Sequence, residues 1–160
     1  MDSDTRNRNP AAATRSGLVV RREEVAPVRW TVEEGRMLLR AEHTGGLFSL
    51  LELLTPPGAA PPPHVHEDSD ETFHVLEGEY EIVLGDQVHE AGPGTTVYGP
   101  RGLRHGFRNV GEGPARMLCV ATPGGIESMF EGLARILADP GGPNRERIGE
   151  LVARHRVKYR

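Results

Sequence analysis

The fold of this chain is decided by residues 58–78, which read GAAPPPHVHEDSDETFHVLEG. His64 and His66 are two residues apart, so on an extended strand both imidazoles leave the same face. An acidic turn at 67–70 lets the chain reposition itself, and Glu71 then opens an apolar run. Two short strands therefore offer three side chains that can bind a metal.

A second stretch, residues 94–109, reads GTTVYGPRGLRHGFRN. It predicts a strand, a turn at 100–102 and another strand that carries one more histidine, His105. Only 15 residues, 79–93, separate the two stretches. The second stretch can therefore bring a fourth ligand to the first.

The two stretches follow the patterns G-x5-H-x-H-x4-E-x6-G and G-x5-P-x-G-x2-H-x3-N at all ten defining positions. In this they resemble the two signature motifs of the cupin superfamily, and the chain resembles a single-domain cupin of the quercetin-dioxygenase-like kind. The resemblance implies an all-β fold, an antiparallel double-stranded β-helix or jelly-roll barrel. It also implies one divalent transition metal per chain, bound by His64, His66, Glu71 and His105.

The expected donor set leaves the identity of the metal open. Three neutral imidazoles and one carboxylate leave two positions free on an octahedral ion, which suits Fe, Mn, Co, Ni, Cu or Zn. The single cysteine, Cys119, lies in an apolar run and is expected to be a small buried hydrophobic residue.

Composition and charge narrow the class of protein. With 160 residues the chain is long enough for one domain, and its net charge of −4 gives no reason to expect nucleic acid or an anionic membrane as a partner. It has no apolar run near 18 residues and no signal peptide after Met1, so a cytoplasmic protein is expected.

The hydrophobic pattern divides the chain into three parts. Residues 1–16 lack apolar periodicity and are expected to be a disordered tail. Residues 17–123 are expected to form the β-barrel, starting with strands at 18–20 and 28–32. Residues 124–160 are expected to be a helical extension, with an amphipathic helix over 126–137, a second short helix near 148–152 and a solvated basic tail.

Strand alternation indicates which side chains face the expected metal. Counting from Glu71 places Phe73 and Val75 inward, and counting from His105 places Phe107 and Asn109 inward. Three aromatic residues are further candidates for the same cavity, although the sequence does not settle their faces: Phe48, Tyr80 and Tyr98. Such a lining favours an apolar or aromatic substrate that presents one polar group to the metal.

Two classes of function remain open at this stage. The first is a dioxygenase-like oxidoreductase that acts on a small apolar or aromatic compound; the resemblance then implies that Glu71 is both a ligand and a proton acceptor. The second is a non-redox cupin, either a metal-dependent isomerase or cyclase or a small-molecule-binding protein. One barrel fold hosts many reactions, so the fold does not decide between them.

A homodimer is expected, because the apolar residues 18–20 and Trp30 offer a surface for pairing. The alternative is a monomer in which the C-terminal helix covers that surface.

Overall fold

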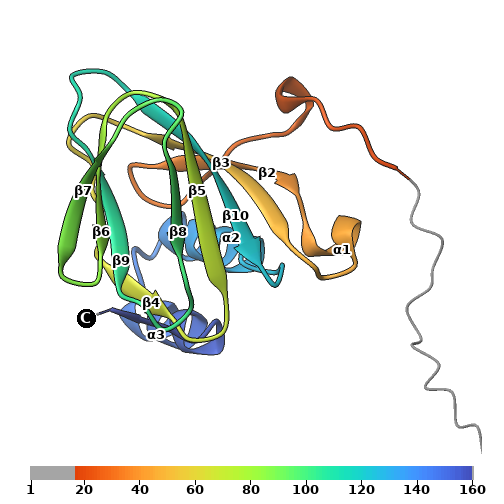
Figure 1. The fold of residues 1–160 in the computed structure, drawn as a ribbon. Coiled ribbons are helices and arrows are strands. Elements are labelled where there is room, and N and C mark those ends of the chain that lie inside the picture. Colours follow the sequence, from red (N-terminus) through yellow and green to blue (C-terminus); the bar gives the residue numbers. More distant parts are fainter. Residues whose placement is uncertain (1–16, 160) are drawn as a thin grey trace, which may run out of the picture.

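The computed structural model describes residues 17–159, so the expected disordered tail lies outside the described residues. These residues form two sheets in which every pair of neighbouring strands is antiparallel (Figure 1). One sheet has the order β1 (Val28–Arg29), β2 (Glu34–Leu39), β3 (Ser49–Thr55), β10 (Ala115–Thr122), β5 (Asp70–Glu77), β8 (Thr96–Gly99). The other has the order β11 (Val157–Tyr159), β4 (His64–His66), β9 (His105–Asn109), β6 (Tyr80–Leu84), β7 (Gln87–Ala91). The predicted double-stranded β-helix is confirmed.

The two predicted C-terminal helices are also present, as α2 (Glu127–Leu137) and α3 (Arg145–Arg154). Two shorter elements precede them, the 3-10 turn η1 (Arg22–Glu24) and the helix α1 (Ala41–Thr44). The helices of the described chain are all too short or too polar to cross a lipid bilayer.

The start of α2 is tied to the sheet by the buried carboxylate of Glu127. This carboxylate accepts hydrogen bonds from the Ser49 hydroxyl on β3 (2.5 Å) and from the backbone N–H of Ala41 (2.8 Å). The apolar face of the helix then covers the end of the six-stranded sheet, where the ring centroid of Phe130 lies 4.3 Å from that of Trp30. Trp30 is only 6% exposed, so the helix covers this part of the expected dimer surface.

Both ends of the described chain differ from the expectation. Residues 18–20 form no strand, and Leu18 and Val19 are exposed. The expected solvated tail instead contains β11, which pairs with β4 so that Val157 lies opposite His66 and Tyr159 opposite His64. The basic tail favours solvent exposure in the sequence, and β11 forms only through its long-range pairing with β4, so the sequence did not indicate it.

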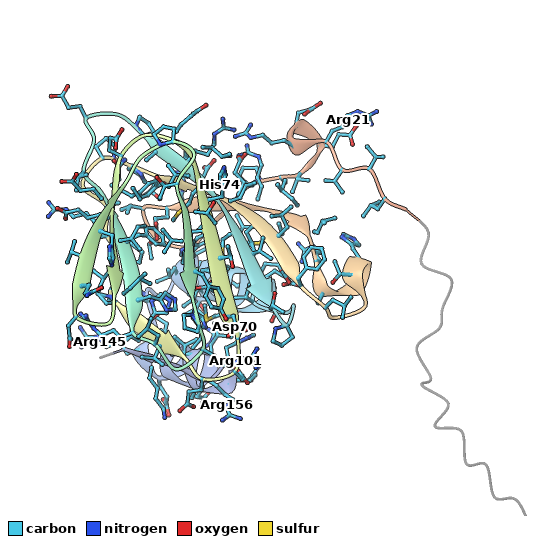
Figure 2. All side chains as sticks on the ribbon, in the orientation of Figure 1. Arg21, Asp70, His74, Arg101, Arg145 and Arg156 are labelled. Carbon is cyan, nitrogen blue, oxygen red and sulfur yellow. The ribbon has the colours of Figure 1, made fainter. Side chains whose placement is uncertain are left out.

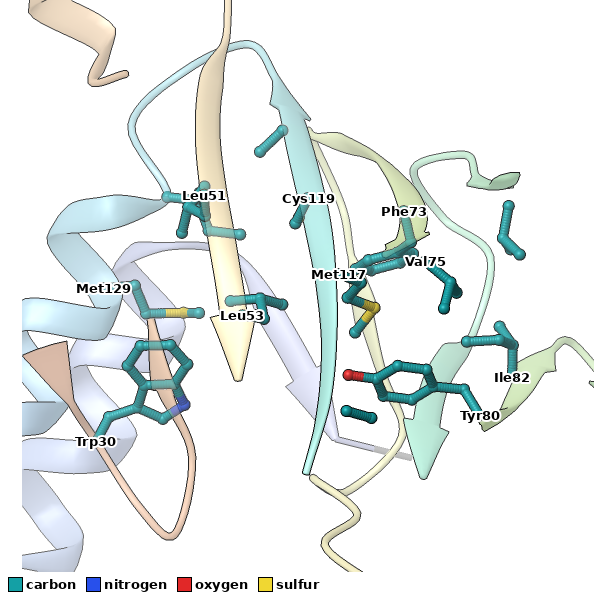
Figure 3. Packing of buried hydrophobic residues seen from close by; sticks show 14 of the residues in the cluster. Trp30, Leu51, Leu53, Phe73, Val75, Tyr80, Ile82, Met117, Cys119 and Met129 are labelled. Atoms are coloured by element: carbon teal, nitrogen blue, oxygen red, sulfur yellow. The ribbon is translucent and has the colours of Figure 1, made fainter. Parts of the chain in front are cut away.

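The core lies between the sheets and is built from alternate residues of their strands (Figure 3). On β5 the buried residues are Glu71, Phe73 and Val75, which agrees with the predicted alternation. Beside β5 in the same sheet, the central strand β10 places Ala121 opposite Glu71 at one end and Ala115 opposite Thr55 of β3 at the other. Glu71 and Thr55 therefore lie at opposite ends of the core between the two sheets.

Candidate metal centre

Four side chains that could bind a metal ion come together from three strands. His64 and His66 come from β4, Glu71 from β5 and His105 from β9, and their ligand atoms all lie within 4.8 Å of one another. The Nε2 atoms of His64 and His66 are 3.1 Å apart, and Glu71 Oε2 lies 3.4 Å from His66 Nε2 and 2.8 Å from His105 Nε2. With bonds of about 2.1 Å, adjacent ligands of an octahedral ion are about 3.0 Å apart and opposite ones about 4.2 Å. The spacing and donor chemistry fit one divalent metal ion.

A clamp between the two motifs holds β5 and the loop before β9 together. The carboxylate of Asp70 accepts hydrogen bonds from the backbone N–H of Arg101 (2.8 Å) and from its guanidinium group (2.9 Å to each oxygen). Figure 2 shows this pair beside the start of β5. The sequence places Asp70 in an acidic, solvated turn. In the structure Asp70, which directly precedes Glu71, anchors the turn at 100–102.

Backbone carbonyl groups orient two of the imidazoles. The Nδ1–H group of His64 donates to the carbonyl of Pro62, and that of His105 donates to the carbonyl of Leu103, both at 3.0 Å. A donor at Nδ1 leaves Nε2 to face the centre, the arrangement in which a second hydrogen bond orients a metal-binding histidine.

The centre is buried, and its charges are coupled. Burial would raise the pKa of Glu71, but hydrogen bonds from His105 and His66 outweigh it and hold this pKa well below its usual range. Burial alone would lower the pKa of His105, whereas its bond to Glu71 raises it. Burial lowers the pKa of His64 to about 4 despite the attraction of Glu71. His64 is therefore neutral and ready to ligate, while a proton on His105 competes with the metal.

Cys119 contacts the centre from β10. It is buried as expected, and its thiol also donates a hydrogen bond of 3.5 Å to Oε1 of Glu71. Burial, together with the nearby Glu71 charge, raises the pKa of this thiol well above its usual value. Cys119 is thus a neutral donor that orients the carboxylate. Only the register of β10 against β5 reveals this role, and the sequence does not show that register.

A cavity of about 250 Å³ adjoins the ligands His64 and Glu71. Phe73 and Phe107 line it, as alternation from the ligands indicates. The rest of the wall is mostly apolar, and much of it comes from segments that the sequence did not assign to the site: Trp30, Met129, Phe130 and Tyr159.

Three other residues that the sequence assigned to the cavity are buried elsewhere. Val75 shares the inner face of β5 but lies beyond the cavity in the closed core. The hydroxyl of Tyr80 is also buried and donates to Thr55 Oγ1 (3.2 Å). The amide of Asn109 clamps a turn by donating to the carbonyls of Thr55 (2.8 Å) and Gly113 (2.9 Å).

The remaining two candidates lie away from the cavity wall. Tyr98 is 57% exposed, because β8 pairs it with Thr72, whose side chain is on the outer face of β5. Phe48 is half-buried just before β3, where its backbone carbonyl accepts a hydrogen bond from the Thr44 hydroxyl (2.6 Å).

Comparison with known proteins agrees with this geometry. The profile of the family described as Cupin domain matches residues 51–121. MJ1618 of Methanocaldococcus jannaschii is 33% identical over 81 residues, which make up 51% of this chain and 65% of that protein. The polyketide synthase CurC of Streptomyces cyaneus is 31% identical over 106 residues, 66% of this chain and 69% of its own length. The quercetin 2,3-dioxygenase of Bacillus subtilis is 30% identical over 105 residues, again 66% of this chain but 30% of that enzyme.

Solved structures also show similarity to this chain. The polyketide cyclase RemF from Streptomyces resistomycificus has a TM-score of 0.59 at 32% identity, over 67% of this chain and 80% of its own. KdgF from Halomonas sp. has a TM-score of 0.65 over 71% of this chain and 99% of its own. At 18% identity, KdgF shows the fold alone.

Proposed function

This chain belongs to the cupin superfamily, and on that premise we propose that it is a metal-dependent enzyme acting on a small aromatic compound that carries oxygen atoms. One observation supports this most: two of the four candidate metal ligands, His64 and Glu71, stand at the wall of an apolar cavity lined by aromatic rings. Small-molecule sites typically combine such a lining with a few polar groups that fix orientation.

The residues of the centre have separable roles in this proposal. A divalent metal held by His64, His66, Glu71 and His105 would polarise a substrate oxygen as a Lewis acid, and a redox-active ion would also support chemistry with O2. Phe73 and Phe107 would hold an aromatic ring beside the ligands and exclude water. Glu71 would accept the proton that the substrate releases.

For the reaction class, we favour non-redox ring formation of the polyketide cyclase type. The support is coverage: the matches to CurC and RemF span 69% and 80% of those proteins, whereas the match to quercetin 2,3-dioxygenase spans 30% of that enzyme. The dioxygenase reaction that the sequence favoured is the second candidate, and the similarity of that one part of the enzyme supports it.

One experiment separates the candidates. Purified protein is analysed for metals and then incubated with an aromatic poly-β-ketone and with flavonols, in air and under argon, while oxygen consumption is recorded. Conversion under argon supports the cyclase, and conversion coupled to oxygen uptake supports the dioxygenase. The double variant His64→Ala/His66→Ala serves as the metal-free control. A metal-loaded protein that converts neither class in either atmosphere contradicts the proposal.

A further inference from the structure

A buried carboxyl group, Glu33, lies in the cavity wall away from the metal ligands. It is 3% exposed and belongs to the segment just before β2 that also contributes Trp30 to the cavity. Acidic side chains are almost never fully buried without a partner. The proposed metal centre does not use this group.

The hydrogen bonds of Glu33 come from neutral groups. Thr55 Oγ1 donates to Glu33 Oε1 at 3.5 Å, and Thr55 in turn accepts from the Tyr80 hydroxyl at 3.2 Å. The indole of Trp30 provides another hydrogen bond. Burial outweighs these bonds and raises the pKa of Glu33 to about 7. Near neutral pH much of the protein therefore carries a protonated Glu33, which can donate a hydrogen bond.

The position of Glu33 sets an upper limit to the length of a ligand that could reach both Glu33 and the metal centre. Its neighbour Thr55 lies opposite Ala115, whereas Glu71 lies opposite Ala121, six residues along β10. Six residues of a straight strand span about 20 Å, which is an upper bound because strands twist and side chains reach inward. One cavity touches both carboxyl groups, so a ligand inside it could reach both of them within this upper bound.

We propose that Glu33 forms a second polar subsite, which donates a hydrogen bond to an oxygen atom at the far end of an elongated, multi-ring aromatic ligand. The near end of that ligand lies at the metal centre, and in this respect the inference rests on the proposed function. Between the two ends, the rings of Trp30, Phe130, Phe73 and Phe107 provide an aromatic wall.

Two probes that differ only at the far end test the subsite. Flavonol carries its chelating oxygens at one end, and its 4′-methoxy derivative adds an oxygen at the other that can only accept a hydrogen bond. Calorimetry gives both affinities for the protein as purified. Because the chelating end is common to both probes, the ratio of the affinities cancels what happens at the metal. This readout needs no turnover.

For wild type at pH 6 we expect the methoxy probe to bind about tenfold more tightly, the value of a typical buried hydrogen bond. This advantage should disappear as the pH rises through about 7, because a carboxylate cannot donate. Glu33→Gln keeps a hydrogen-bond donor, so it should bind the methoxy probe more tightly both below and above pH 7. Glu33→Leu should show no preference for the methoxy probe.

The other titratable groups facing Glu33 have pKa values away from this pH range. Those lining the cavity are His64, Glu71 and Tyr159, and Tyr80 lies behind Thr55. Burial raises the pKa of Tyr80 to about 12 and also raises that of Tyr159.

Trp30 is the only tryptophan, so its fluorescence should shift near pH 7 in wild type and not in Glu33→Gln.

The outcomes separate the two hypotheses. Equal ratios in wild type, Glu33→Gln and Glu33→Leu, or a ratio that does not change with pH, would overturn the subsite and leave the metal-dependent function standing. A ratio that behaves as expected in a protein without turnover would leave the subsite and reject the enzyme. If neither probe binds wild type, the ligand class is wrong and the subsite falls with it. Should Glu33→Leu fail to fold, the pH dependence of wild type against Glu33→Gln decides alone.

Discussion

Replacement of Val157 by alanine should loosen the strand that carries two of the candidate metal ligands. β11 pairs with β4 at three positions, whereas β9, the other neighbour of β4, pairs with it at one, between His64 and His105. Val157 is 4% exposed and is the one buried residue of β11. Its side chain is therefore the main apolar contact that holds β11 in place.

The size of the effect follows from the methyl groups removed. Val157→Ala deletes two buried carbon groups at about 0.8 kcal/mol each, and a residual cavity adds to this, so we expect a loss of about 2 kcal/mol in the free energy of unfolding. Metal affinity should fall about tenfold, the lower end of what is lost when the partners that orient ligands are removed.

Urea unfolding gives the stability, and competition with a chelator gives the metal affinity. Lys158→Ala is the matched control on the same strand: its ion pair with Glu67 is on the surface, so about 0.5 kcal/mol or less should be lost. If Val157→Ala lost the expected stability but bound metal as tightly as wild type, the reasoning that β11 positions β4 would be refuted.

Four further outcomes are expected. The double variant His64→Ala/His66→Ala should lose most of its metal, and wild-type metal affinity should fall as the pH drops through the raised pKa of His105, whose proton competes with the metal, whereas His64 stays neutral down to about pH 4; full metal occupancy of the double variant by elemental analysis would contradict the site. Glu71→Gln should keep part of the metal and lose turnover by about 10²–10⁴-fold, because it removes a base and keeps an oxygen donor. Metal content and product formation are measured on one preparation, and activity that merely follows occupancy would leave Glu71 a ligand only. Since burial raises the pKa of Glu33 from 4.5 to about 7, wild type should lose stability as the pH rises across this interval. Glu33→Gln should then be the more stable protein at pH 8, by up to about 3 kcal/mol in urea unfolding, and an identical pH dependence would contradict a buried titrating carboxyl. The predicted homodimer is checked by light scattering, where a mass near 17.5 kDa at all micromolar concentrations would exclude it.

The parts of the structure that local pattern encodes could be predicted from the sequence. The strand that carries Glu71, Phe73 and Val75 shows its buried face by alternation alone, and the spacing of His64 and His66 places both on one face of a strand. Helix α2 is amphipathic over its whole length, so its existence is also legible in the sequence.

Features that depend on long-range pairing could not be predicted. Glu33 stands beside Glu34 and resembles a residue of a surface turn until β2 pairs with β3 and brings Thr55 to it. Trp30 looks like an exposed anchor for a partner until α2 covers it. Tyr98 is aromatic, like the residues that line the cavity, but the register of β8 places it on the outer face of the sheet.

The central position of β10 has a consequence for synthesis of the chain. β10 lies between β3 and β5, and residue 115 pairs with residue 55, which a ribosome makes 60 residues earlier. Until β10 emerges, β3 and β5 each present an unpaired apolar edge, the kind of edge that joins neighbouring chains. Such non-local pairing is slow to form. Chains that stop before residue 115 should therefore aggregate.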